Sequence, residues 1–261
     1  AWLFKSKDTD LLQLYEAKYI NQYNHRFSNW TNTSTQYVQL NELINPDFTI
    51  DTQYYLESKE LKSRFGAKKW FLVYRMIARA TDERTMIASF IPYNPCGNSL
   101  SVIELDDINT ALFVLGNFNS LVFDFFARQN VGGTNFNHWI LKQLPVINFS
   151  VIGPNIEKLI LNKVFNLVYT ASDLKSLAFD YGINNEPFTW DEEERFHLKC
   201  ELDAIYGHLY GLTREEFDYI LETFPIVKRK DIAKYGTYRT KDTILQLYDE
   251  MDWVKEEMEK T

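Results

Sequence analysis

The stretch WFLVYRMIARATDERTMIASFIP, residues Trp70–Pro92, places two apolar runs on either side of a polar segment. The runs are rich in β-branched and aromatic residues, and the polar segment is rich in Thr and Asp, which predicts a β-hairpin or a strand–turn–strand unit. Arg75, Arg79 and Arg84 lie along the polar segment. Their planar guanidinium groups can bind an anion or a base edge, or they can pair with neighbouring acidic side chains at the surface. The stretch alone leaves both roles open.

A basic segment leads into this stretch. Between Lys59 and Arg79 the chain carries seven basic residues against Glu60 alone, a local charge of +6. The basic residues are Lys59, Lys62, Arg64, Lys68, Lys69, Arg75 and Arg79. Such a charge is large enough to bind a phosphate backbone. A solvated charged loop accounts for the same charge equally well.

Charge is unevenly distributed over the 261 residues, whose net charge is −8. Residues 1–150 hold 14 basic and 14 acidic residues, whereas residues 151–261 hold 14 basic and 22 acidic residues. The net charge argues against a protein that coats nucleic acid by bulk electrostatics. The asymmetry predicts a boundary near residue 150, between a mixed α/β part and an acidic helical part.

Residues 1–150 predict short strands and one long helix. Mixed periodicity with many Tyr and Phe favours strands over Leu11–Trp30. A helix is expected from an N-cap at Asp106-Asp107 to about Gln129, because apolar residues recur there at helical spacing. Further expected features are a loop at Thr31–Thr35, a turn at Asn45–Asp47, strands at Ile50–Leu56, Leu100–Leu105 and His138–Val146, and a loop at Tyr93–Ser99.

Residues 151–261 predict helices. They are expected at Ile156–Tyr169, at Trp190–Tyr210 with acidic residues in its first turn, and at Thr240–Glu259. A capping box formed by Thr213 and Glu216 starts a further helix, which ends at Phe224-Pro225. The expected fold is therefore α+β: a mixed-sheet domain with one long helix over 1–150, then a helical subdomain over 151–261.

Catalytic and cofactor motifs are hard to find in this sequence. Neither glycine-rich nucleotide loop occurs, and Cys96 and Cys200 lack zinc-site spacing. Asn94-Pro95-Cys96-Gly97 begins like the Asn-Pro-Pro-Tyr motif of amino-methyltransferases, but it lacks the aromatic that stacks on a flipped base. Asp10, Glu16 and Lys18 roughly match the residue types of a metal-dependent nuclease site. Their loose spacing often arises by chance.

The sequence also bears on membrane association, on the cellular compartment and on the start of the chain. No apolar run approaches the roughly 18 residues of a spanning helix, so no membrane partner is expected. The two distant cysteines favour a reducing cytoplasm. The chain starts without Met and without a signal-peptide layout, as expected for a piece of a longer protein.

Three stretches resemble the C-terminal target recognition (specificity) region of type IIG restriction–modification enzymes and related bacterial phage-defence DNA methyltransferases. They are LYEAKYINQYNHRF (Leu14–Phe27), RMIARATDERTMIASFIP (Arg75–Pro92, with Asp82 where the family usually has Asn) and LDAIYGHLYGLTREEFDYILETFP (Leu202–Pro225). Leu115–Val146 resembles the family's connecting stretch, so the resemblance spans nearly the whole chain in the same order.

The resemblance implies a domain that positions a DNA duplex and reads its sequence. In the family, an upstream domain binds S-adenosylmethionine, flips the target base and methylates adenine N6, and type IIG members add a nuclease that requires Mg²⁺. Neither catalytic domain is expected in this chain, so the fragment itself is not expected to be an enzyme. Its implied partners are double-stranded DNA and the upstream methyltransferase domain.

The resemblance also turns polar residues into DNA-binding candidates, because Arg pairs with guanine and Asn with adenine. The candidates are Lys18, Asn24, His25, Arg26, Lys62, Arg64, Lys68, Lys69, Arg75, Arg79, Thr81, Arg84, Thr85, Arg128, Gly132, Gly133 and Asn135. Motif residues shared by enzymes with different targets should not read bases. We therefore expect phosphate clamps or fold-bracing ion pairs at Arg75, Arg79, Arg84 and His25-Arg26. Base readers are expected in Ser28–Gln39, Glu57–Lys69 or Tyr93–Ser99.

A different class of function stays open beside DNA recognition. The chain could be an interaction module that docks the methyltransferase domain or a partner subunit through its acidic helical part, without itself binding DNA. Such a module predicts tight binding to that partner and no binding of a duplex.

Overall fold

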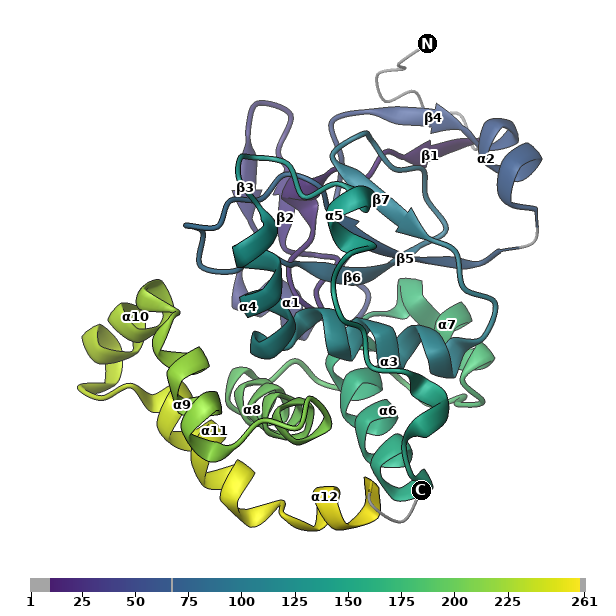
Figure 1. The fold of residues 1–261 in the computed structure, drawn as a ribbon. Helices are drawn as coiled ribbons and strands as arrows, with labels where there is room; N and C mark the ends of the chain where they lie inside the picture. Colours follow the sequence, from purple (N-terminus) through teal and green to yellow (C-terminus); the bar gives the residue numbers. More distant parts are fainter. Residues whose placement is uncertain (1–9, 67, 259–261) are drawn as a thin grey trace. The chain divides into compact units, whose positions relative to one another are not determined.

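The computed structural model describes residues 10–66 and 68–258, which fold into helices and small antiparallel sheets and form two compact units (Figure 1). Unit 1 comprises the residues up to Ile77 together with Ile87–Ala111 and Asn166–Trp190. Unit 2 comprises Ala78–Met86, Leu112–Phe165 and the residues from Asp191 onward. The expected α+β class is confirmed. The boundary predicted near residue 150 lies inside a segment of unit 2, so the compact units do not follow it.

A three-stranded antiparallel sheet lies at the centre of unit 1, with β5 (Trp70–Arg75) between β6 (Ala88–Pro92) and β7 (Leu100–Ile103). Residues Trp70 to Tyr74 are all buried, which explains why β5 reads as a continuous apolar run. β5 and β6 pair in register from Trp70 opposite Pro92 to Tyr74 opposite Ala88. The strand–turn–strand prediction for this stretch is confirmed, as is the strand after residue 99.

Two smaller sheets complete the strands of unit 1. β1 (Leu11–Gln13) pairs with β4 (Tyr55–Glu57), and β2 (Ser28–Trp30) pairs with β3 (Thr35–Tyr37), both antiparallel. The predicted strands over 11–30 and 50–56 are therefore real but shorter. A 3-10 turn, η1 (Ala17–Tyr19), interrupts the first of them.

Short helices surround the core of unit 1, and the sequence did not predict them. They are α1 (Leu40–Ile44), α2 (Ser58–Phe65), η3 (Ser172–Leu174) and α7 (Lys175–Asp180). Trp70 donates its indole N–H to Asp180 Oδ2 at 2.9 Å, which ties α7 to the start of β5. The core itself gathers Tyr15, Tyr19, Ile50 and the inner residues of β5 into one buried cluster.

The single long helix expected between residues 106 and 129 is wrong. The structure has α3 (Ile108–Asn119) and α4 (Leu121–Asn130), with a bend of 66° between them. Ser120 takes an extended conformation and its hydroxyl accepts the N–H of Phe123, so it caps a new helix instead of continuing the old one. The predicted N-cap at Asp107 is confirmed, because its carboxylate accepts the Thr110 N–H at 2.7 Å.

The strand expected at His138–Val146 is also wrong, since α5 (His138–Leu141) lies there. The Asn137 side chain accepts the backbone N–H groups of Trp139 and Ile140 and so starts a helical turn. This local cap outweighs the strand-like composition of the segment. A 3-10 turn, η2 (Phe149–Val151), follows.

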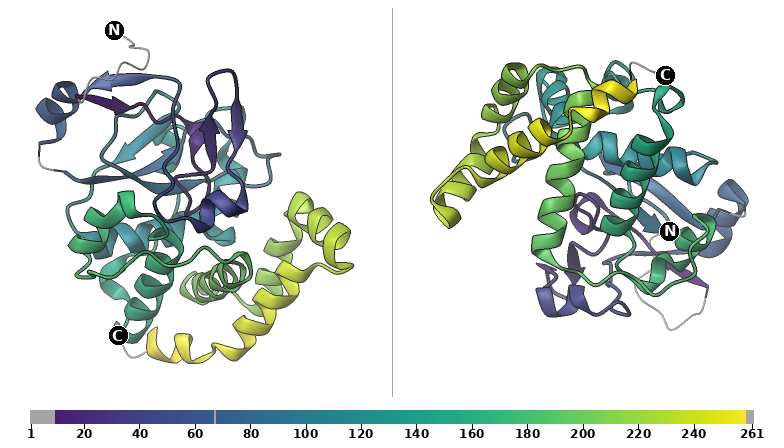
Figure 2. Two further views of the ribbon diagram at one scale, coloured as in Figure 1. Left: turned by 180° about the vertical axis from the view of Figure 1, so that it is seen from behind. Right: turned by 90° about the horizontal axis from the view of Figure 1, so that it is seen from below.

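The C-terminal helices largely follow the sequence pattern. α6 (Pro154–Val168), α8 (Glu192–Leu209) and α9 (Arg214–Glu222) confirm three of the predicted helices, including the capping box at Thr213 and Glu216. The last predicted helix divides into α11 (Arg239–Glu250) and α12 (Trp253–Met258), while Glu259 lies outside the described residues. Helix α10 (Pro225–Tyr235) was not predicted from the sequence. Figure 2 shows α8 to α12 from two further sides.

A buried carboxyl on α8 gives unit 2 an expected pH dependence. Asp203 accepts the Leu121 N–H at 2.6 Å at the start of α4. Burial raises the pKa of Asp203 to about 6, although the charge of Arg84 and the Leu121 N–H oppose this shift. A raised carboxyl pKa contributes stability that is complete below the ordinary pKa near 4 and is lost as the pH rises to about 6.

Asp203→Asn is therefore expected to gain stability relative to wild type as the pH rises from about 4 to about 7, by about 2–3 kcal/mol. The asparagine oxygen can still accept the Leu121 N–H. Urea unfolding across this pH range measures the difference, with the exposed Asp252→Asn as a matched control. A difference that does not change with pH would show that folding does not raise the pKa of Asp203.

Within the described ranges, no single helix has the length and apolar character needed to cross a membrane. The bent pair of α3 and α4 meets the length and composition requirement only when its two helices are combined.

Candidate functional site

The loop between β5 and β6, Ala78–Met86, belongs to unit 2 and is called the arginine loop here. A buried carboxylate from α4, Asp124, fixes the end of this loop. Its Oδ1 accepts the backbone N–H groups of Thr85 and Met86 at 2.8 and 2.7 Å. Its Oδ2 lies 2.9 Å from Arg84 Nε. Asp124 has no exposed surface, so these bonds form away from water.

Arg128, one turn further along α4, holds the rest of the arginine loop. Its guanidinium donates to the carbonyl oxygens of Asp82 and Glu83, and it also lies 3.4 Å from Asp124. The ring of Phe224 covers it, with the guanidinium carbon 4.2 Å from the ring centroid. The loop is thus held by backbone hydrogen bonds to buried charged groups, which makes its shape specific.

These contacts give three of the predicted site residues a structural role. Arg84 also donates to the Asn119 carbonyl and lies near the Phe224 ring. The buried Thr85 hydroxyl donates to the Arg79 carbonyl at 3.0 Å. In this conformation Arg84, Arg128 and Thr85 brace the loop, which is one of the two roles expected for motif residues.

The outer part of the arginine loop faces solvent. Arg79 and Thr81 are exposed, and a turn is closed by the Arg79 N–H bonded to Asp82 Oδ2 at 3.0 Å. The loop Val131–Phe136, called the glycine loop here, joins it through a hydrogen bond from Ala78 N–H to the Thr134 carbonyl at 3.1 Å. Two segments that lie far apart in the sequence therefore meet in unit 2.

The glycine loop presents open backbone. Gly132, Gly133 and Asn135 are all exposed, and a Cβ atom built on either glycine would have nothing within 4 Å. A ligand can therefore approach the main chain closely at this point. Together with Arg79 and Thr81, these residues form one exposed polar surface, defined here as the loop surface.

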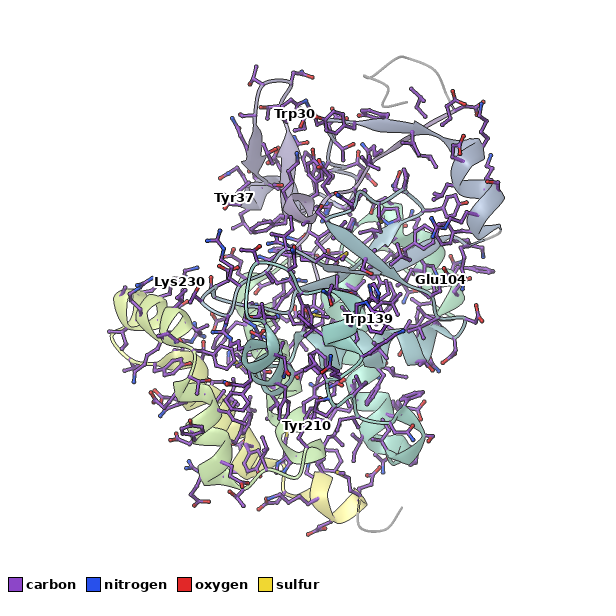
Figure 3. All side chains as sticks on the ribbon, turned by 45° about the horizontal axis from the view of Figure 1, so that its top comes forward. Trp30, Tyr37, Glu104, Trp139, Tyr210 and Lys230 are labelled. Atoms are coloured by element: carbon purple, nitrogen blue, oxygen red, sulfur yellow. The ribbon has the colours of Figure 1, made fainter. Side chains whose placement is uncertain are left out.

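Helix α10 supplies cations that the sequence prediction missed. It carries Lys228, Arg229, Lys230 and Lys234 against Asp231 alone, and three of the cations (Arg229, Lys230 and Lys234) are exposed. Lys230, labelled in Figure 3, pairs with Glu83 of the arginine loop. The signal was present as a Lys-Arg-Lys run between Pro at the first helical position and Gly236 at the C-terminus. The acidic total of residues 151–261 concealed it.

Arg26 in unit 1 is bound entirely by the protein. Its guanidinium donates to the carbonyl oxygens of Leu43, Asn45, Phe48 and Thr170 at 2.9–3.0 Å, and it has no exposed surface. Arg26 is therefore not accessible to DNA in this conformation, contrary to the expectation from the sequence, and it ties distant loops of unit 1 together. Asn24, two residues before Arg26, is also buried, and its side chain accepts the Arg26 N–H.

His25 and Arg75 are also committed to internal contacts. The His25 ring lies 2.9 Å from the Asp173 carboxylate and is almost completely buried. Burial alone would raise the pKa of Asp173, but His25 and Arg26 bring its pKa below the ordinary value. Arg75 donates to the Ile20 carbonyl and lies over the Phe27 ring.

The basic segment of unit 1 divides into paired and exposed groups. Lys68 pairs with Asp106 at 2.8 Å and Lys69 with Asp180 at 3.1 Å. Lys62 and Arg64 project from α2 and are exposed, so they stay candidates for phosphate contacts. Lys18 is partly exposed and pairs with Glu16 at 2.9 Å.

No cluster of three or more His, Cys, Asp or Glu side chains that could hold a metal occurs in the described ranges. In the Asn94–Gly97 segment, Pro95 and Gly97 are buried, and their backbone bonds to Tyr15 at 2.8 Å hold the loop on the core.

Comparison with protein-family models finds no matching family for this chain. Comparison with curated proteins finds no match either. The resemblance to target recognition regions therefore stays a prediction from the quoted motifs.

Proposed function

We propose that this chain is a sequence-specific duplex DNA recognition domain of a restriction–modification or phage-defence DNA adenine methyltransferase. It would position the target for a catalytic domain that binds S-adenosylmethionine elsewhere in the parent protein. The observation that supports this most is the loop surface. Buried charges hold the loop in one shape while Arg79 and the open glycine backbone face outward.

The loop surface has the chemistry of a phosphate contact. The Arg79 guanidinium can bind a phosphate with two parallel hydrogen bonds. Exposed backbone N–H groups also bind phosphate oxygens, and glycine allows the close approach that this requires. Contacts of this kind orient a protein on the duplex without reading its sequence.

Helix α10 extends the same chemistry. Arg229, Lys230 and Lys234 give it an exposed cationic side, and the Lys230–Glu83 pair connects it to the arginine loop. The cations of α10 can thus contact phosphates of the DNA backbone next to those bound by the loop surface. This arrangement concentrates positive charge in one part of an acidic chain.

Duplex binding with a measurable salt dependence is the expected result for the 261-residue chain. The logarithm of the binding constant should fall linearly with the logarithm of salt concentration between about 50 and about 200 mM. Arg79→Gln combined with Arg229→Gln should weaken binding and reduce that slope by about 2, one for each lost phosphate contact. Fluorescence anisotropy with a labelled duplex measures both quantities.

Arg214→Gln is the matched control, because Arg214 is an exposed arginine of unit 2 whose Nε already pairs with Asp249 at 2.8 Å. Its salt slope should equal that of the wild type. An unchanged slope for the Arg79 and Arg229 variant would remove the site assignment. Failure of the wild type to bind any duplex, with tight binding to a methyltransferase domain, would favour the interaction module instead.

A further inference from the structure

The β2–β3 hairpin of unit 1 forms a two-stranded ribbon whose tip is exposed. Asn29 pairs with Gln36 and Trp30 with Thr35, and Thr31 N–H bonds to the Ser34 carbonyl at 3.0 Å to close the turn. Every residue from Asn32 to Tyr37 is exposed, and Tyr37 retains 70% of its accessible surface. Trp30 packs at the edge of the unit 1 core and anchors the ribbon (Figure 3).

The side chains of the ribbon are polar but uncharged. No Asp, Glu, Lys or Arg occurs from Ser28 to Asn41, and the tip reads Thr-Asn-Thr-Ser-Thr-Gln. Within the described part of the chain, the Asn32 and Gln36 amides make no hydrogen bond to another residue. By contrast, the Asn29 amide oxygen accepts the Asp51 N–H and the Gln39 amide donates to the Tyr37 carbonyl. Two amides are thus left available at the tip.

The other two loops expected to read bases are less suited to it. In Tyr93–Ser99, backbone bonds to Tyr15 hold Pro95 and Gly97, and Asn98 alone falls in the exposed class. In Glu57–Lys69, the exposed polar groups are mainly the charged side chains of α2. Charged side chains on α2 suit phosphates, whereas the ribbon offers the neutral amides and hydroxyls that pair with base edges.

The ribbon also has the right dimensions for a DNA groove. Its strands lie about 4.8 Å apart, and the major groove of B-DNA, about 12 Å wide, admits a two-stranded ribbon. In Figure 1 and the left view of Figure 2, the ribbon and α2 lie toward the same end of unit 1 but at opposite sides of it.

We propose that the β2–β3 ribbon enters the major groove of the target duplex and that Asn32 and Gln36 read base edges there. Both amides match the N6 and N7 atoms of adenine, so the recognised sequence contains adenine at the positions they contact. This inference rests on the proposed function and adds the residues that determine its specificity.

Selection from a randomised duplex pool by the full 261-residue chain tests this assignment. The variant combines Asn32→Gly with Gln36→Ala. Glycine is chosen at position 32 because Asn32 has φ 68°, which glycine adopts without strain. The expected result is that the variant loses discrimination at the adenine positions by roughly 5- to 150-fold. It keeps the wild-type affinity for unselected duplex, which also shows that it is folded.

Two control variants test the contributions of the Tyr93–Ser99 loop and of helix α2 separately from that of the ribbon. Asn98→Ala removes an exposed amide from the Tyr93–Ser99 loop and should leave the enriched sequence unchanged. Lys62→Gln with Arg64→Gln should lower the affinity for every duplex alike without changing the enriched sequence.

The outcomes distinguish this inference from the proposed function. If the ribbon variant enriches the same sequence as the wild type, the ribbon assignment is wrong while duplex recognition stands. Loss of the enriched sequence in Asn98→Ala, with the ribbon variant unaffected, would transfer base reading to that loop. A wild type that binds no duplex, or binds all duplexes equally, would overturn both proposals.

Discussion

Replacing Asp124 with alanine is expected to lower the free energy of unfolding by about 3–5 kcal/mol, the usual cost of breaking a buried ion pair from one side. The variant leaves Arg84 without its partner carboxylate and weakens the contacts of Arg128. It also removes the acceptor of two buried backbone N–H groups, those of Thr85 and Met86. The two buried donors left without a partner account for part of this loss, at about 1–3 kcal/mol each.

Urea unfolding followed by circular dichroism measures this loss. Asp124→Asn serves as the graded comparison, because its amide oxygen can still accept both N–H groups although the charge is gone. Glu250→Ala, an exposed acidic residue of unit 2, is the neutral control. A loss below about 1 kcal/mol for Asp124→Ala would mean that the arginine loop is not held by this carboxylate.

Arg26→Met is expected to destabilise the protein by about 3–5 kcal/mol, even though methionine fills much of the same space. The change leaves four carbonyl oxygens without their donor, on segments as far apart as Leu43 and Thr170. Arg26→Lys should be almost as harmful, because one ammonium group cannot replace a planar fork that reaches four acceptors. Thermal unfolding of both variants measures the effect.

The same variant separates a structural arginine from a DNA contact. At temperatures below its unfolding midpoint, the Arg26→Met variant should bind duplex with the same salt dependence as the wild type. A variant that is fully stable but binds duplex weakly would instead place Arg26 on the nucleic acid. For comparison, Arg79→Gln is expected to behave in that second way, since its side chain is exposed.

Local pattern predicted the hairpin of β5 and β6 and most C-terminal helices, because each depends on periodicity and caps within a short stretch. The bend at Ser120 and the start of α5 at Asn137 depend on single capping side chains. Both caps could have been recognised, but the apolar stripe before residue 129 and the strand-like composition after residue 138 outweighed them.

Whether each arginine side chain points into the protein or toward solvent could not be predicted from local sequence. Arg84 turns inward to pair with Asp124, which lies 40 residues further along the chain. Arg26 turns inward to donate to the carbonyl of Thr170, which lies 144 residues away. Only the folded chain brings these partners together. The motifs predicted that Arg26 and Arg84 clamp phosphates or brace the fold instead of reading bases. The contacts of Arg26, Arg84 and Arg128 agree with the bracing alternative.

The measurement that tests the central proposal most directly is competition between two duplexes for the wild-type chain. One duplex carries the sequence enriched from a randomised pool, and the other has the same composition in scrambled order. We predict that the enriched duplex binds more tightly by a factor on the order of 1,000 or more. Equal affinity for the two duplexes, or no binding to either, would contradict sequence-specific recognition by this protein.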